Sequence, residues 1–157
     1  MKRLLLLITI FTYYSVFAQD SIRIYSLIEQ SREALKKSDV TLALQFAHQS
    51  LSFSSQKQNY KGITSANNQI AAIFESQSNY DSANYFLNKS IALAEKQQLK
   101  NELASAHNLS GLILWHQSQY KEALPHHAIS LSLFQETKNQ KGIADTYAKT
   151  GNVFYDL

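Results

Sequence analysis

The chain has no cysteine, one proline and four glycines among its 157 residues. Without cysteine it can form no disulfide and has no thiolate nucleophile, so its fold must be stable without covalent cross-links. The four glycines are scattered along the sequence and build no glycine-rich phosphate-binding loop. Thiol chemistry and phosphate-loop nucleotide binding are therefore excluded, and no low-complexity linker divides the chain.

The longest apolar run stands at the N-terminus, where Lys2 and Arg3 precede residues 4–16. Val16-Phe17-Ala18 then places small residues at positions −3 and −1 of a cleavage site before Gln19. This layout predicts a secretory signal peptide over residues 1–18 and export to the periplasm or the cell exterior. The alternative is an N-terminal membrane anchor, although the run is short for a span, which needs about 20 residues. No other membrane span is expected.

A strong charge of one sign is also missing. The full chain carries a net charge of +3 at pH 7. Loss of Lys2 and Arg3 with the signal peptide would leave thirteen basic and twelve acidic residues. These basic residues form no cluster, whereas nucleic acids and anionic membranes select a concentrated basic face. We therefore expect no nucleic-acid partner.

A period of forty residues runs through the rest of the chain. It is visible in three sets of identical residues: Ser38, Ser78 and Ser118; Ala43, Ala83 and Ala123; and Ser50, Ser90 and Ser130. Such a period marks a supersecondary unit that buries its apolar face against neighbouring copies. The repeat domain, residues 19–157, then consists of the units 21–60, 61–100 and 101–140 and a partial unit, 141–157.

Each full unit contains two amphipathic helical patterns. In the second unit Ile63, Ala66, Ile70, Ala71 and Phe74 recur at spacings of three and four residues, as one face of a helix does. The first helices are predicted over 22–37, 62–77 and 102–117, the second over 40–57, 80–97 and 120–137, and a further first helix begins near 142. Short polar connections join them, which predicts antiparallel helix pairs and an all-α fold.

The repeated positions resemble those of the tetratricopeptide repeat family. The strings at 79–83, Asn-Tyr-Asp-Ser-Ala, and at 119–123, Gln-Tyr-Lys-Glu-Ala, are similar to the family's turn and second-helix start. The matching structural positions are Ala71, Tyr80, Ala83, Gly111, Tyr120, Ala123 and Gly151. The period exceeds the family's commonest length of about 34 residues, and the long variant resembles repeats that precede bacterial sensor histidine kinases. The resemblance implies an α-solenoid wound into a right-handed superhelix.

The same resemblance implies a concave groove lined by the first helices. Carried over by position, its ligand-binding residues are Asn68, Ala72, Glu75, Asn108, Leu112, Trp115, His116, Asn152 and Tyr155. Trp115, the only tryptophan, either anchors an apolar or aromatic ligand group or packs on the neighbouring unit. The asparagines at 68 and 108 either bond a peptide backbone or are solvated helix residues.

No pattern indicates an enzyme, a metal site or a cofactor. Serine, histidine and aspartate are present, but no spacing or elbow motif joins them into a catalytic site. His126 and His127 are neighbours, and neighbouring helix residues point about 100° apart, which does not favour a shared metal. His107 falls at a position where the family packs a large side chain. We expect no catalytic residue, no metal and no cofactor.

The predicted function is therefore binding of a protein or peptide. The preferred setting is the exported sensory or scaffolding part of a larger signalling protein, and the alternative is a free-standing secreted or periplasmic scaffold. In the last predicted helix Val153 and Phe154 continue the apolar columns, where the end of a solenoid normally carries a polar face. We expect this face to be covered by a continuation of the array, by a partner or by a second copy.

Overall fold

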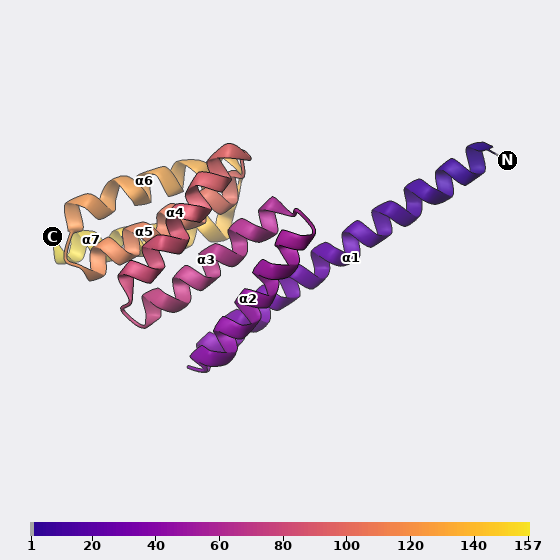
Figure 1. Ribbon diagram of the computed structural model, residues 1–157. Coiled ribbons are helices and arrows are strands. Elements are labelled where there is room, and N and C mark those ends of the chain that lie inside the picture. The colour runs from indigo at the N-terminus through magenta and orange to yellow at the C-terminus, as the bar shows by residue number, and fades with distance from the viewer. Residues whose placement is uncertain (1) are drawn as a thin grey trace.

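The computed structural model describes the backbone of residues 2–157 and the side chains of residues 18–157. Over this range it contains helices and no strand: α1 (Lys2–Lys36), α2 (Val40–Gln56), α3 (Tyr60–Ser76), α4 (Tyr80–Lys96), α5 (Lys100–His116), α6 (Tyr120–Glu136) and α7 (Gln140–Asp156). Each helix packs against the next, and the first helices of successive units, α1, α3, α5 and α7, also contact one another in that order. The predicted all-α solenoid of helix pairs is confirmed (Figure 1).

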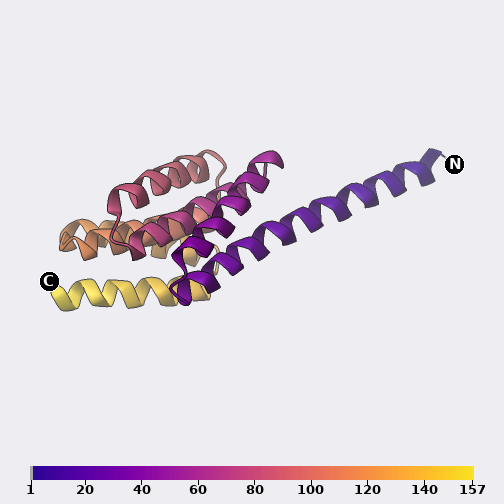
Figure 2. The ribbon, with the colours of Figure 1, turned by 60° about the horizontal axis from the view of Figure 1, so that its bottom comes forward.

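The helix boundaries follow the repeat except at the N-terminus. Helices α2 to α7 each have 17 residues and begin within two residues of the predicted positions. Helix α1 instead runs unbroken from Lys2 to Lys36, through the segment where the signal peptide is predicted (Figure 2). The side chains of residues 1–17 lie outside the described part, so the signal peptide stays a prediction. Within the described residues, no helix combines the length and the apolar character that crossing a membrane requires.

All six connections between helices share one three-residue form. The middle residue has a positive φ of 50–61°, although none is glycine: Ser38, Gln58, Ser78, Gln98, Ser118 and Lys138. The amide of the following residue donates to the carbonyl five positions earlier, as Asn79 does to Phe74 at 2.9 Å, which is the bond of a Schellman C-cap. In four connections an Asp or Asn side chain then caps the next helix, as Asn79 accepts from the Ser82 amide. One repeated turn therefore sets the spacing of the array.

Small and hydroxylated side chains join the helices of the first two units. Ala43, Ala83 and Ala123, from one repeated position, are fully buried. The buried Ser50 hydroxyl donates to the carbonyl of Ile24 at 3.1 Å, and Ser90 makes the equivalent bond to Thr64 at 3.3 Å. A buried hydroxyl needs such a partner. In these two units the repeated serine therefore marks the surface on which the second helix packs against the first, whereas the equivalent Ser130 contacts Thr146 of α7.

The position shared by Ala71, Gly111 and Gly151 differs from unit to unit. Ala71 is fully buried in an apolar cluster that includes Leu87 of α4. At Gly111 an added Cβ would lie 2.6–2.9 Å from three atoms of the His127 ring in α6, so only glycine admits that ring. At Gly151 an added Cβ would meet no atom within 4 Å, and the residue is exposed. The position is thus a tight contact in α5 and open surface in α7.

Candidate ligand-binding groove

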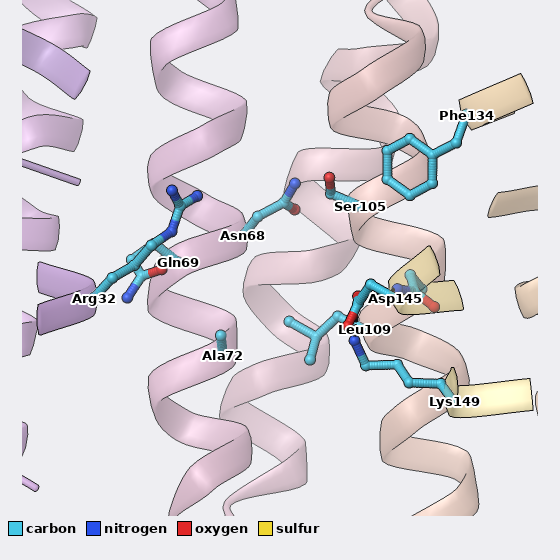
Figure 3. A pocket seen from close by; sticks show the side chains of 10 residues that line it. Arg32, Asn68, Gln69, Ala72, Ser105, Leu109, Phe134, Asp145 and Lys149 are labelled. Atoms are coloured by element: carbon cyan, nitrogen blue, oxygen red, sulfur yellow. Dashed lines mark hydrogen bonds and ion pairs between the residues drawn. The ribbon is translucent and has the colours of Figure 1, made fainter. Parts of the chain in front are cut away.

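Side chains from all four first helices line one open pocket of about 330 Å³. Figure 3 shows Arg32 of α1 and Lys149 of α7 on opposite sides of this pocket, with Asn68 and Leu109 between them. We call it the first-helix pocket; its lining is Arg32, Asn68, Gln69, Ala72, Ser105, Asn108, Leu109, Phe134, Asp145 and Lys149. Its volume lies at the small end of the range, roughly 300–1,000 Å³, found for ligand sites. Because every unit contributes to it, its shape depends on the stacking of the whole array.

The two asparagines predicted for the groove each connect one first helix to the next. The partly buried Asn68 of α3 donates through Nδ2 to the backbone carbonyl of Glu102 in α5, at 3.0 Å. Asn108 of α5 is buried and donates through Nδ2 to Oδ2 of Asp145 in α7, at 2.7 Å. Both amide groups therefore already serve the stacking of the units. A ligand in the pocket would meet them as fixed parts of its wall.

The Asn108 amide is also fixed from behind by His127. The Asn108 Oδ1 accepts from Nδ1 of His127 at 3.0 Å, which places the imidazole proton on Nδ1. Burial lowers the pKa of His127 to about 4, and the charge of Lys149 acts in the same direction. His127 is therefore neutral near pH 7. The contact with His127, inside the third unit, therefore fixes the orientation of the Asn108 amide in the first-helix pocket.

His116 contacts both a carboxylate and an aromatic ring near the C-terminal ends of α3 and α5. His116 Nε2 lies 3.0 Å from Oε1 of Glu75, and the Glu75 side chain is only 14% exposed. Burial raises the pKa of the Glu75 carboxyl, and the neighbouring His116 and Lys149 side chains oppose that rise. The Trp115 ring lies 4.6 Å from the His116 ring, centroid to centroid, and its Nε1 donates to Oδ2 of Asp156 at 2.7 Å. The tryptophan is partly buried and holds α7 against α5.

A second half-buried carboxylate, that of Glu102, lies near the N-terminal ends of α3 and α5. Glu102 Oε1 is 3.8 Å from Nζ of Lys61, and burial raises the pKa of the Glu102 carboxyl against the effect of that lysine. The Lys61 ammonium also lies 5.7 Å from the centre of the Tyr25 ring. Burial, followed by the charge of Glu102, raises the pKa of the Tyr25 hydroxyl. Polar groups from α1, α3 and α5 meet here too.

The remaining predicted groove residues lie outside the first-helix pocket. Leu112 is partly buried, whereas Asn152 and Tyr155 of α7 are exposed, Tyr155 at 91%. None of these three lines the first-helix pocket. The pocket instead includes seven residues outside the predicted set: Arg32, Gln69, Ser105, Leu109, Phe134, Asp145 and Lys149. The forty-residue period could have identified most of these residues. Ser105 and Asp145 share one repeated position, and Gln69, Leu109 and Lys149 share another.

Two further histidines of the third unit, His107 of α5 and His126 of α6, contact each other. Nδ1 of His107 lies 3.1 Å from Nδ1 of His126, with the ring centres 5.2 Å apart. The rings thus meet almost end-on, as in a hydrogen bond in which one Nδ1–H donates to the other nitrogen. Burial lowers the pKa of both. Among residues 18–157, no three histidine, aspartate or glutamate side chains converge as metal ligands would.

In comparison with known proteins, no family model matches this chain and no curated protein matches it. The geometry of the first-helix pocket is therefore the basis for a functional proposal. That geometry comprises a polar floor of fixed amides, a cationic side chain at each side and a short apolar stretch at Ala72 and Leu109.

Proposed function

We propose that this chain is a non-enzymatic recognition module, similar to tetratricopeptide repeat proteins, that binds a protein segment or peptide through the first-helix pocket. The observation that carries the proposal is that four separate helices direct polar side chains into one open pocket. An extended peptide presents backbone donors and acceptors at regular intervals, and fixed amide and charged groups suit such a ligand. Arg32 and Lys149 would meet carboxylate or carbonyl groups, and Leu109 would contact an apolar side chain.

Preorganisation supports the same proposal. Asn68 and Asn108 are held by bonds to the neighbouring helix, so little rotamer entropy is lost when a ligand contacts them. Trp115 is restrained by its bond to Asp156 and presents part of its ring to solvent. Rigid aromatic and amide groups of this kind are typical of recognition surfaces. No described arrangement supports a better case for catalysis, and an enzyme is not proposed.

A peptide selection would test this function. A random peptide library displayed on phage is selected against the immobilised chain, and the enriched peptides are synthesised and titrated against variants. Arg32→Ala should weaken binding at least tenfold, because Arg32 lines the pocket and its described ion pair is with the exposed Glu29. The matched control is Lys36→Ala, which removes a similar i,i+3 pair from the same helix outside the pocket. Failure to enrich any peptide, or equal binding by both variants, would contradict the proposal.

We further propose that the module is exported, in line with the N-terminal signal-peptide pattern. Its preferred setting is the sensory or scaffolding part of a larger signalling protein, and the alternative is a free-standing periplasmic or secreted scaffold. Cell fractionation, with an antibody raised against residues 60–140, separates these settings. A large membrane-bound species supports the receptor, a species no larger than the 17.8 kDa of this chain supports the free scaffold, and a cytosolic species contradicts export.

A further inference from the structure

His107 of α5 and His126 of α6 face each other through their Nδ1 atoms. The two nitrogens lie 3.1 Å apart, and the ring centres lie 5.2 Å apart. In the sequence His126 adjoins His127, but the His127 ring bonds Asn108 instead, and the partner of His126 in space comes from the other helix of the unit. The pair of facing imidazoles therefore forms only when α6 packs on α5.

The forty-residue repeat shows that the helix pair packs without either histidine. At the position of His126 the first two units carry Phe46 and Phe86, both partly buried. At the position of His107 the other first helices carry Leu27, Asn67 and Tyr147. The third unit has a histidine at both positions, and these two side chains are in contact. Packing of the unit alone therefore does not account for two imidazoles at this place.

The separation of the two nitrogens suits two ligands of one metal ion. Bonds from a metal such as zinc to histidine nitrogen are about 2.0–2.1 Å long, so two such ligands lie about 2.8–3.0 Å apart at a right angle and about 3.3–3.4 Å apart at a tetrahedral angle. The observed 3.1 Å falls between these values. The rings now meet almost end-on, and rotation about χ2, a broad torsion in histidine, turns both nitrogens toward one point beside the line that joins them.

Both rings can offer a lone pair to a metal at neutral pH. Burial lowers the pKa of each ring, so the neutral form predominates near pH 7. With the remaining proton of each ring on Nε2, both Nδ1 atoms are free to coordinate. The Glu95 carboxylate of α4 lies close enough for its charge to act on His107, and that charge would favour a bound cation. Both histidines are partly exposed, so water can complete the coordination shell.

We propose that His107 and His126 together bind one divalent transition-metal ion of the Zn²⁺ type, with water as the remaining ligands. Imidazole nitrogen suits Zn²⁺, Cu²⁺ and Ni²⁺, whereas Mg²⁺ and Ca²⁺ prefer oxygen ligands. The bound ion joins α5 to α6 and thereby stabilises the third unit. Neither histidine lines the first-helix pocket, so this proposal does not rest on peptide binding there.

Isothermal titration of ZnCl₂ into the full chain, purified without a histidine tag, measures the binding. One Zn²⁺ per chain is expected, and MgCl₂ should give no binding. His107→Asn and His126→Phe introduce the residues that the second unit carries at these positions, so both variants should fold. Each should bind Zn²⁺ at least about tenfold more weakly, because the second imidazole binds intramolecularly once the first is attached. His48→Ala is the matched control, since it removes an exposed histidine from α2.

Each outcome decides the proposal. Zn²⁺ binding that both single variants weaken and His48→Ala preserves supports a shared site. No binding by the unchanged chain, or binding that either single variant leaves intact, overturns it. Circular dichroism verifies that the variants keep their helices. Electron paramagnetic resonance of Cu²⁺ added to the unchanged chain gives a test without any variant: splitting from two imidazole nitrogens supports the site, and splitting from fewer than two overturns it.

Discussion

The same substitution at two glycines of one repeated position should change stability in opposite directions. Alanine is favoured over glycine inside a helix by about 1 kcal/mol. At Gly151 the new methyl group meets no atom within 4 Å, so Gly151→Ala should raise the free energy of unfolding by up to about 1 kcal/mol. At Gly111 the methyl group would lie 2.6–2.9 Å from three ring atoms of His127.

The cost at Gly111 is set by how little the His127 ring can move. The residue is 2% exposed, and its Nδ1 is bonded to Asn108 at 3.0 Å, so the ring cannot rotate away without breaking a buried bond. Overpacking of this kind costs about 1–3 kcal/mol. Because the helix-propensity gain is common to both substitutions, Gly111→Ala should be less stable than Gly151→Ala by about 1–3 kcal/mol.

Urea denaturation followed by far-UV circular dichroism measures this difference. A comparison without the His127 ring tests whether this ring causes the difference. When Gly111→Ala is introduced into a His127→Ala background, the methyl group gains room and should stabilise the helix by up to about 1 kcal/mol. The reasoning is refuted if Gly111→Ala is as stable as Gly151→Ala, or if the loss persists without the His127 ring.

Other perturbations should have equally definite results. The pKa of His127 lies near 4 in the folded chain and near 6.5 in the unfolded chain, so only the unfolded state takes up this proton as the pH falls between those values. The unfolding free energy should decrease by up to about 3 kcal/mol over that window, and His127→Leu should remove this part of the pH dependence; identical pH profiles would contradict the assignment. Ala83→Arg buries a charge without a partner at a fully buried position and should lower the free energy of unfolding by at least about 3 kcal/mol. Asn84→Arg, at the exposed neighbouring position, should change it by less than about 0.5 kcal/mol. A similar melting temperature for both variants would show that the helix register is wrong. Trp115→Ala should weaken binding of the selected peptides while helicity remains, and a loss of helicity would show that Trp115 acts only through its bond to Asp156.

The sequence predicts the helices more completely than it predicts the residues of the site. The amphipathic pattern and the polar breaks recur every forty residues, and local propensities within them predict helices to within two residues for α2 to α7. The sequence predicts the residues that line the first-helix pocket less completely. Asn68 and Asn108 occupy one repeated position, yet the first bonds a backbone carbonyl and the second bonds Asp145 and His127. Those partners come from neighbouring helices, which the local pattern does not specify.

What the sequence determined by itself is the class of fold, because periodicity, capping residues and turn spacing are local properties of the chain. The structure decided which repeated positions are interior. Ala71, Gly111 and Gly151 are equivalent in the sequence, but only the first two lie beneath a second helix, and Gly151 faces open space in the described array. Burial depends on what packs from outside a helix, so identical periodicity can produce a core position in one unit and an exposed position in the next.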